Sequence, residues 1–436
     1  IDRAEPGSTA GLLKKAYASS VRIGILRVGH TSATLAQRCL SAAEEVLQRD
    51  ANNPYASDLA ANCYVNLAEA AQAQGQDSEQ LRRRGIEILE RTMHQYPNFL
   101  WGASDLAISY TVLASEQAVR GDERLRATLE KSLSWLRVAT SLDDTFINPS
   151  MNALVNLSIL IQTVSDEREV ADIVARADDL FAQCTHINVN SQECYDNYFL
   201  VYISAAQRLF VAGKEPGPLL ARGFANYEIT RKTGGPLLDA EQSAALGRYI
   251  EAAQSVRQRR DPGQALAELQ AALGRCFTIA ATDATCRTLA AQAEWVAADW
   301  LALQHLQFTQ VLRRALAKAT LATQSPELYP GKWQVLAQTH LRLARAALPA
   351  ARAEQVHAGL AAVARSFAVN PNHALSLATK GELLLLRAQS LTAPAPRRAT
   401  AQEAADQLAQ ALRRDPLLSH DYAATWAQAK ALAAAP

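Results

Sequence analysis

Residues 39–63 read CLSAAEEVLQRDANNPYASDLAANC, and this segment contains the features that define the fold. Two stretches rich in the helix formers Ala and Leu flank the turn sequence DANNP at 50–54. Asp and Asn favour turns, and Pro ends one helix and can begin the next, where its missing N–H costs nothing. Cys39 and Cys63 lie at equal distances from the turn centre. We therefore expect two antiparallel helices on which these cysteines face each other.

The remaining cysteines repeat this symmetry about other turns. The three pairs and their centres are Cys39/Cys63 at 51, Cys184/Cys194 at 189 and Cys276/Cys286 at 281. The centres are 138 and 92 residues apart, which are three and two multiples of 46. Prolines mark a similar period, at Pro54, Pro97, Pro149, Pro236, Pro330, Pro371 and Pro416. These spacings predict a repeat of about 45 residues that divides into two helices.

The composition favours a helical array of such repeats. The chain has 436 residues, of which 49% are hydrophobic and only 6% aromatic, and Gly (19) and Pro (16) are few. We predict an all-α fold, a right-handed superhelical solenoid of about nine helix–turn–helix units. The predicted units span residues 8–52, 53–96, 97–146, 147–189, 190–235, 236–282, 283–328, 329–370 and 371–416, followed by a terminal helix at 417–434. Capping patterns predict that second helices of units begin near Asp166, Asp261 and Thr400.

The repeated unit resembles a known superfamily. An Ala-rich helix, a polar break and a second helix ending in Leu/Val-x-x-Asp/Asn-Pro resemble the tetratricopeptide repeat, in a form with longer helices. The break AVRGDER at 118–124, followed by LEKSL at 129–133, is similar to repeat regions of bacterial membrane-anchored serine/threonine protein kinases. The kinase His-Arg-Asp and Asp-Phe-Gly motifs are absent from the sequence. The resemblance therefore implies a non-catalytic region that binds a ligand.

The six cysteines can be explained in three ways. Disulfides Cys39–Cys63, Cys184–Cys194 and Cys276–Cys286 would leave no cysteine unpaired and are the prediction that we favour. Reduced cysteines in an Ala-rich core are the main alternative, and a metal site is the least favoured. Disulfides imply an oxidising compartment. We therefore expect an extracytoplasmic location, periplasmic or at the cell surface, with membrane contact only through an anchor preceding Ile1; a cytoplasmic location is the alternative.

Charge and motifs bear on the other function classes. The 44 basic and 43 acidic side chains give a net charge of +1, so we expect no nucleic acid partner. The eight histidines form no pair at i, i+4, and no Gly-rich phosphate loop or Gly-x-Ser-x-Gly occurs. We therefore expect no enzymatic activity, no cofactor and no metal.

Polar residues at fourfold spacing on the first helices of units are the candidates for a ligand groove. The pairs Asp58/Asn62, Asp105/Ser109 and Asn152/Asn156 follow one another at steps of 47 residues, so each pair shares a helical face. Asn197 and the flanking Tyr195 and Tyr202 are further candidates. The alternatives are an ordinary solvated face or helix caps for the polar pairs, and core packing for the tyrosines.

These observations predict a non-catalytic module that binds a protein or peptide in a concave groove. Its expected setting is the extracytoplasmic sensor region of a bacterial serine/threonine kinase. The alternative is a scaffold or assembly protein without a signalling role, such as a repeat lipoprotein or a cytoplasmic adaptor.

Overall fold

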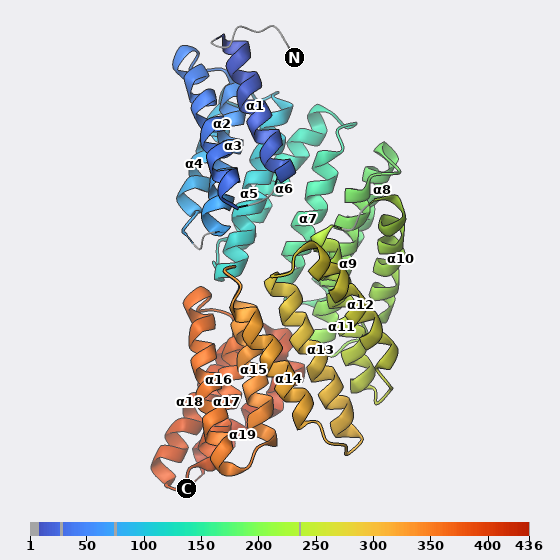
Figure 1. Ribbon diagram of the computed structural model, residues 1–436, viewed down its shortest axis with the longest axis vertical. Coiled ribbons are helices and arrows are strands. Elements are labelled where there is room, and N and C mark those ends of the chain that lie inside the picture. Colours follow the sequence, from blue (N-terminus) through green and yellow to red (C-terminus); the bar gives the residue numbers. More distant parts are fainter. Residues whose placement is uncertain (1–7, 27–28, 74–75, 235–236, 436) are drawn as a thin grey trace.

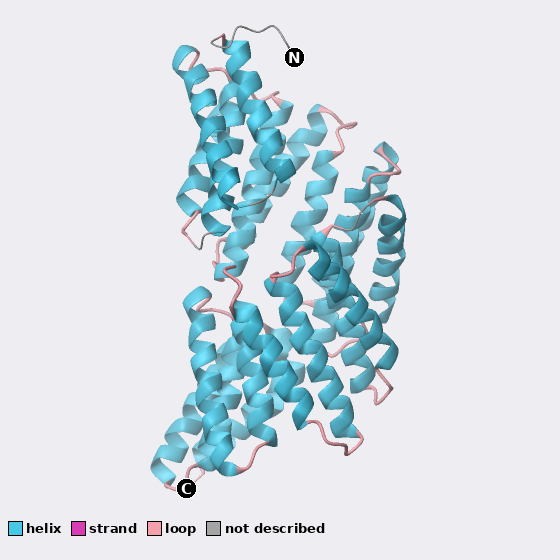
Figure 2. Ribbon diagram, in the orientation of Figure 1, coloured by secondary structure: helices cyan, strands magenta, loops and turns pink. Residues whose placement is uncertain are grey.

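The computed structural model describes residues 8–26, 29–73, 76–234 and 237–435, and Pro236 and Ile1 lie outside them. In this part of the chain all regular secondary structure is helical, which confirms the all-α class (Figure 2). The helices are α1 (Thr9–Leu26), α2 (Gly29–Arg49), α3 (Pro54–Ala73), α4 (Glu79–Gln95), α5 (Leu100–Arg120), α6 (Leu125–Leu142), α7 (Asn148–Gln162), α8 (Glu167–Ile187), α9 (Gln192–Val211), α10 (Gly217–Thr233), α11 (Leu238–Arg257), α12 (Gly263–Ile279), α13 (Ala284–Leu303), α14 (Thr309–Thr323), α15 (Pro330–Ala346), α16 (Pro349–Val369), α17 (Ala374–Ser390), α18 (Pro394–Arg414), η1 (Pro416–Leu418) and α19 (Ser419–Ala434). None of the described helices combines the length and hydrophobicity that a membrane span requires.

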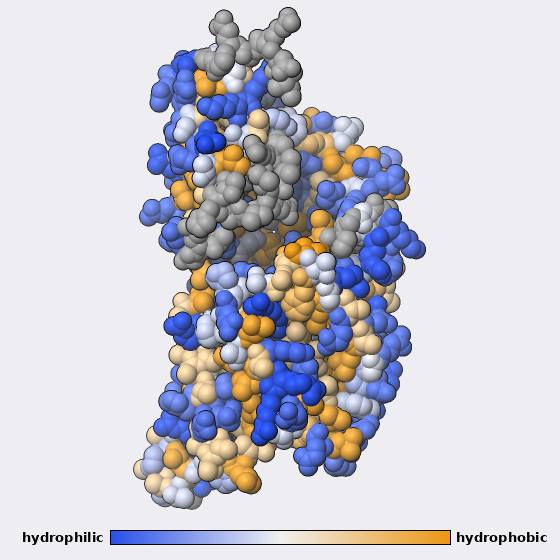
Figure 3. All heavy atoms as spheres, viewed as in Figure 1, coloured by the Kyte–Doolittle hydropathy of each residue, from blue (hydrophilic) through white to orange (hydrophobic). Residues whose placement is uncertain are grey.

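Consecutive helices pack as hairpins, from α1 with α2 to α17 with α18, and each hairpin packs against the next (Figure 1). This repeated helix–turn–helix arrangement is the one predicted; the individual unit boundaries stay a prediction. We call the first helix of each hairpin its A helix and the second its B helix. On the face shown in Figure 3, hydrophilic and hydrophobic residues are interspersed.

Local signals explain where several helices begin. The Asp166 side chain accepts a hydrogen bond from the Arg168 N–H (3.0 Å) and caps α8. Asp261 accepts from the N–H of Gly263 (2.9 Å), where α12 begins. The start predicted near Thr400 is wrong, because α18 begins at Pro394, a residue suited to the first helical position.

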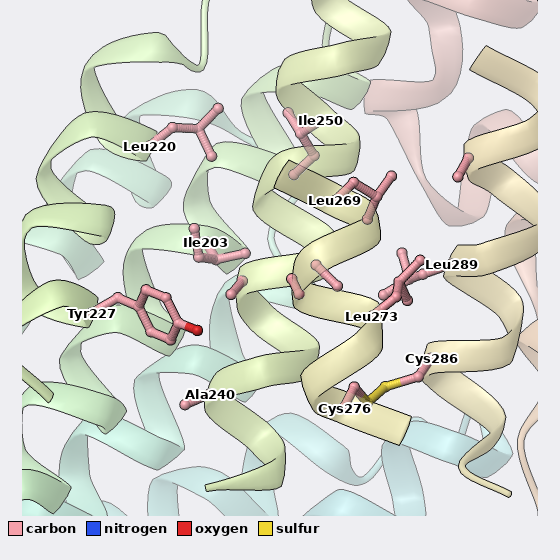
Figure 4. Packing of buried hydrophobic residues seen from close by; sticks show 14 of the residues in the cluster. Ile203, Leu220, Tyr227, Ala240, Ile250, Leu269, Leu273, Cys276, Cys286 and Leu289 are labelled. Atoms are coloured by element: carbon pink, nitrogen blue, oxygen red, sulfur yellow. A yellow bond between two sulfur atoms is a disulfide. The ribbon is translucent and has the colours of Figure 1, made fainter. Parts of the chain in front are cut away.

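Neighbouring hairpins share their hydrophobic cores. One cluster contains Ile203, Leu220, Ile250, Leu269 and Leu289, which come from the five successive helices α9 to α13 (Figure 4). Each of these side chains is nearly or fully buried, and burying a Leu or Ile contributes about 1.5–3 kcal/mol. A hairpin cannot cover both of its apolar faces alone, so stacking supplies most of its stability.

Polar side chains connect neighbouring A helices. Asn62 Nδ2 donates to Asp105 Oδ2 (2.6 Å), 43 residues along the chain. Trp295 Nε1 donates to Thr339 Oγ1 (3.0 Å), 44 residues along. These separations match one repeat, so polar contacts as well as apolar packing align the stack.

Three disulfides join the B helix of one hairpin to the A helix of the next. The pairs and their Cα–Cα distances are Cys39–Cys63 (5.9 Å), Cys184–Cys194 (6.1 Å) and Cys276–Cys286 (6.6 Å, Figure 4). These are the pairs favoured by the sequence, and the distances lie in the range that disulfides allow. Their oxidation state in the cell stays a prediction.

The last helices return to touch much earlier ones, which the sequence did not predict. Arg208 in α9 binds both carboxylate oxygens of Asp415 (2.8 and 2.9 Å), 207 residues later. Arg257 binds Asp421 of α19 (2.9 Å), and Glu123 pairs with Arg414 (2.8 Å). We call the contact surface formed by these three pairs the seam. In Figure 1, helices α13 to α19 accordingly lie below α5 and beside α9.

Two glycines allow the close approach at the seam. Gly121 directly follows α5, and Gly213 lies two residues beyond the end of α9. Their φ values are positive, 67° for Gly121 and 73° for Gly213. A Cβ atom would lie 2.2 Å from Asn370 Oδ1 at Gly121 and 2.3 Å from His420 Nδ1 at Gly213. Glycine is therefore required by backbone conformation and by the packing of distant segments.

The disulfides should stabilise the stack measurably. Because Cys184 and Cys194 close a short loop, we expect the double variant Cys184→Ser/Cys194→Ser to lose about 3 kcal/mol in the free energy of unfolding. Urea denaturation of the wild type with and without a reducing agent checks this. If the cysteines are merely buried thiols, reductant will leave the wild-type midpoint unchanged, which would contradict the prediction.

The seam should depend on its least exposed ion pair. Arg208 and Asp415 have side-chain exposures of 11% and 17%, so Asp415→Asn should lower the stability of the C-terminal hairpins by about 1–3 kcal/mol. Asn can still cap η1, as Asp415 does for the Leu417 N–H. Hydrogen exchange of α17 to α19 measures the effect. The matched control is Glu123→Gln, because the Glu123 side chain is 75% exposed and its ion pair with Arg414 should contribute little to stability. Equal effects of the two variants on hydrogen exchange would contradict this prediction.

Candidate functional site

The structure brings three of the nine predicted groove residues together. Asp58 and Asn62 of α3 meet Asp105 of α5, where the two carboxyl groups share a hydrogen bond and Asn62 donates to Asp105. Burial, reinforced by the charge of Asp105, raises the pKa of Asp58 well above its usual range, and burial raises the pKa of Asp105. The pair therefore holds a proton at a pH at which free carboxyl groups have lost theirs.

Two further candidates lie in the interior. Asn156 is fully buried, where its Oδ1 accepts from Thr111 Oγ1 (2.8 Å) and its Nδ2 donates to Ser132 Oγ (2.8 Å). Ser109 is also buried. Asn156 thus links the third hairpin to the fourth.

The last four candidates make hydrogen bonds within the protein. Asn152 Nδ2 donates to the Asn148 carbonyl, and Asn197 Nδ2 donates to the Met151 carbonyl (2.9 and 3.1 Å). The list is completed by Tyr195, which donates to the Val189 carbonyl, and by the fully buried Tyr202, which donates to Asp178. A role of the nine residues in ligand binding stays a prediction.

The structure contains a cavity of about 780 Å³, which the sequence did not indicate. Its walls come from the A helices α9, α11, α13, α15 and α17, and η1 and α19 contribute Leu418, Asp421 and Tyr422. The seam thus places the end of the chain across a groove made by five A helices. One signal in the sequence could have indicated it: Gln334 and Gln338 have the same fourfold spacing that we used for α3, α5 and α7.

Aromatic rings and amides give the cavity its chemistry. Tyr249, Trp295 and Tyr422 line it, and burial raises the pKa of both tyrosines, so their hydroxyls are protonated donors. Neither hydroxyl makes a hydrogen bond to a described residue, and the same holds for the side chains of Gln207 and Gln292. The cavity therefore presents unused donors and acceptors beside apolar surface.

Ion pairs between neighbouring A helices hold the cavity wall in place. Arg342 Nη1 contacts Asp299 Oδ1 (2.5 Å), and its guanidinium lies 4.9 Å from the centre of the Trp295 ring. Arg345 Nη2 contacts Glu382 Oε1 (2.5 Å). These pairs join α13 to α15 and α15 to α17, so the wall is pre-organised.

In the described part of the chain, one group of three potential metal-ligating side chains comes together: Cys276, Asp283 and Cys286. Both sulfur atoms belong to a disulfide. Asp283 caps α13 by accepting from the Cys286 N–H (2.7 Å), and it also accepts from Gln242 Nε2 (2.9 Å). Disulfide bonding and helix capping account for this cluster.

These features define the chain as a helical-repeat protein in which the C-terminal segment lines a cavity together with five A helices. No protein-family model matches it, and a search of curated proteins finds no match. Among solved structures, a tetratricopeptide-repeat protein of Thermus thermophilus is similar at 16% identity and a TM-score of 0.38, over 54% of this chain and 98% of that one. A human IFIT1 dimer with PPP-AAAA is similar at 12% identity and a TM-score of 0.44, over 100% and 92%.

The Asp58–Asp105 pair should make stability depend on pH. Above pH 3.8 the folded protein retains a proton that the unfolded chain loses, so the free energy of unfolding falls as pH rises towards the raised pKa of Asp58. Asp58→Asn, which never ionises, should reduce this fall. Urea midpoints at about pH 5 and about pH 8 check it.

The control is Glu45→Gln, because Glu45 is exposed on α2 and should leave the pH dependence unchanged. If the urea midpoint fell by the same amount between about pH 5 and about pH 8 in Asp58→Asn and in the wild type, the Asp58–Asp105 pair would not be the group that binds the proton.

Proposed function

We propose that this chain is a non-catalytic module that binds a segment of a partner protein, as an extended peptide, in the cavity of the concave side. The observation that carries the proposal is the cavity itself, with its wall of A helices and its unused hydrogen-bonding groups. Its volume of about 780 Å³ lies within the range of about 300–1,000 Å³ that is typical of ligand sites.

The residues in the cavity suit a peptide backbone. Gln207 and Gln292 can each donate to a carbonyl and accept from an N–H group of an extended chain. The rings of Tyr249 and Tyr422 offer apolar area and a hydroxyl, a combination that suits mixed polar and apolar ligands. These groups lie on helices that are fixed by ion pairs, so little side-chain order is lost on binding.

The cellular setting that we propose is the extracytoplasmic sensor region of a bacterial serine/threonine kinase. It rests on the three cysteine pairs and on the resemblance of residues 118–124 and 129–133 to repeat regions of such kinases. A scaffold or assembly protein without a signalling role is the alternative. Thiol titration of protein isolated from its native compartment tests the location, and six free thiols would contradict it.

Selection of peptides tests the binding function. A phage-displayed library of random peptides is selected on the wild-type chain, and the selected peptides are measured on Gln292→Trp, which fills part of the cavity. We expect the affinity to fall by about tenfold or more, because the indole occupies the peptide site. Gln310→Trp, on the exposed surface of α14, is the control.

Both variants should keep the thermal midpoint of the wild type. Selected peptides that bind all three proteins equally would place the peptide site elsewhere, and a selection that enriches no peptide would contradict the proposed function.

A further inference from the structure

We propose that the peptide bound in the cavity carries a carboxylate beside an apolar side chain, and that the Arg259 guanidinium binds this carboxylate. The inference rests on the proposed function and adds the chemical class of the ligand. It follows from three features: a segment of the chain that already lies at the cavity, the arginines that hold this segment, and the conformation of Arg259.

The chain's own C-terminal segment shows what the concave side binds. Residues 415–422, DPLLSHDY, contribute Leu418 and Tyr422 to the cavity wall. The same segment places the carboxylates of Asp415 and Asp421 on two arginines of the A helices. An acidic and apolar segment is therefore complementary to this surface.

The two receptor arginines are built alike. Arg208 and Arg257 lie in the last turns of α9 and α11. Each also donates to a carbonyl at or just beyond the end of the preceding A helix, Val164 for Arg208 and Phe210 for Arg257. In Arg208, Nη1 and Nη2 each donate to one oxygen of Asp415, whereas in Arg257 the Nη2 group donates to both oxygens of Asp421.

Arg259 follows the second of these arginines and lines the same cavity. Its φ of 55° is left-handed, a conformation that L residues other than glycine rarely adopt. The equivalent position one repeat earlier, 46 residues before, is Gly213, whose missing side chain makes room for His420. His305, one repeat later, has the same left-handed φ (58°), so this conformation is the cap that follows these A helices. At Arg259 the capping residue carries a long cationic side chain that lines the cavity.

The charge of Arg259 has no partner among the described residues. The other arginines of the cavity, Arg257, Arg342 and Arg345, each pair with a carboxylate. Arg259 is exposed at the cavity, so its guanidinium is available to an anionic group of a ligand. Val256 and the 43%-exposed Leu303 also line the cavity, which places apolar surface within the same site.

A labelled synthetic peptide of residues 415–422 is the probe, measured by fluorescence anisotropy on the full chain. Arg259→Gly should weaken binding by about threefold to fivefold at low salt, and the difference should vanish at high salt, because a partly exposed ion pair is screened. Arg259→Gly should keep or raise the thermal midpoint, since glycine relieves the strain. If Arg259 had a purely structural role, Arg259→Gly would instead lower the thermal midpoint.

Controls on both partners isolate the ion pair. Arg260→Gln changes the adjacent arginine, which does not line this cavity, and should bind the probe like the wild type. A probe with both aspartates replaced by asparagine should bind the wild type and Arg259→Gly equally weakly. Equal affinity of the acidic probe for the wild type and Arg259→Gly, or no binding of it to the wild type, would overturn the inference.

The phage selection separates this inference from the proposed function. Suppose that the selected peptides lose affinity for Gln292→Trp, are not enriched in Asp or Glu, and bind Arg259→Gly as well as the wild type. This result would support the proposed function and refute the role of Arg259. Peptides that do not depend on Gln292 would refute the cavity as the binding site altogether.

Discussion

The constraint on which this structure depends is that each helical hairpin has two apolar faces and can cover neither alone. Stacking solves this problem, since clusters such as that of Ile203, Ile250 and Leu289 span several hairpins. Contacts such as Asn62 with Asp105 repeat at the same interval and keep equivalent positions in line. The candidate cavity lies along the A helices of five stacked hairpins.

Contact between the C-terminal segment and earlier helices adds a second requirement. The seam combines ion pairs, glycines that admit close contacts, and apolar packing of Val211 against the cluster that contains Leu418 and Tyr422. Such a contact depends on its least exposed pair, Arg208 with Asp415, because exposed pairs contribute little. The same contacts add Tyr422 to the residues that line the cavity.

Charge placement distinguishes structural from binding groups in this cavity. Arg342 and Arg345 are neutralised by partners one hairpin away, so they fix the wall. Arg259 is not neutralised by any described residue, and it occupies a backbone conformation in which the preceding repeat has glycine. The Arg259 charge at the cavity is therefore available to an anionic ligand.

The sequence alone determined the local features of this protein. It determined the helical class, the repeated hairpins and the partners of Cys39, Cys184 and Cys276, because these depend on propensity and on residues near one turn. It did not determine which side of a helix faces the groove: the fourfold spacing of Asn152 and Asn156 defines a shared face, but the packing of neighbouring hairpins buried Asn156. Only the tertiary structure decided the seam and the cavity. Arg208 and Asp415 are 207 positions apart in the sequence, and they meet through small rotations summed over several hairpins, which no local pattern records.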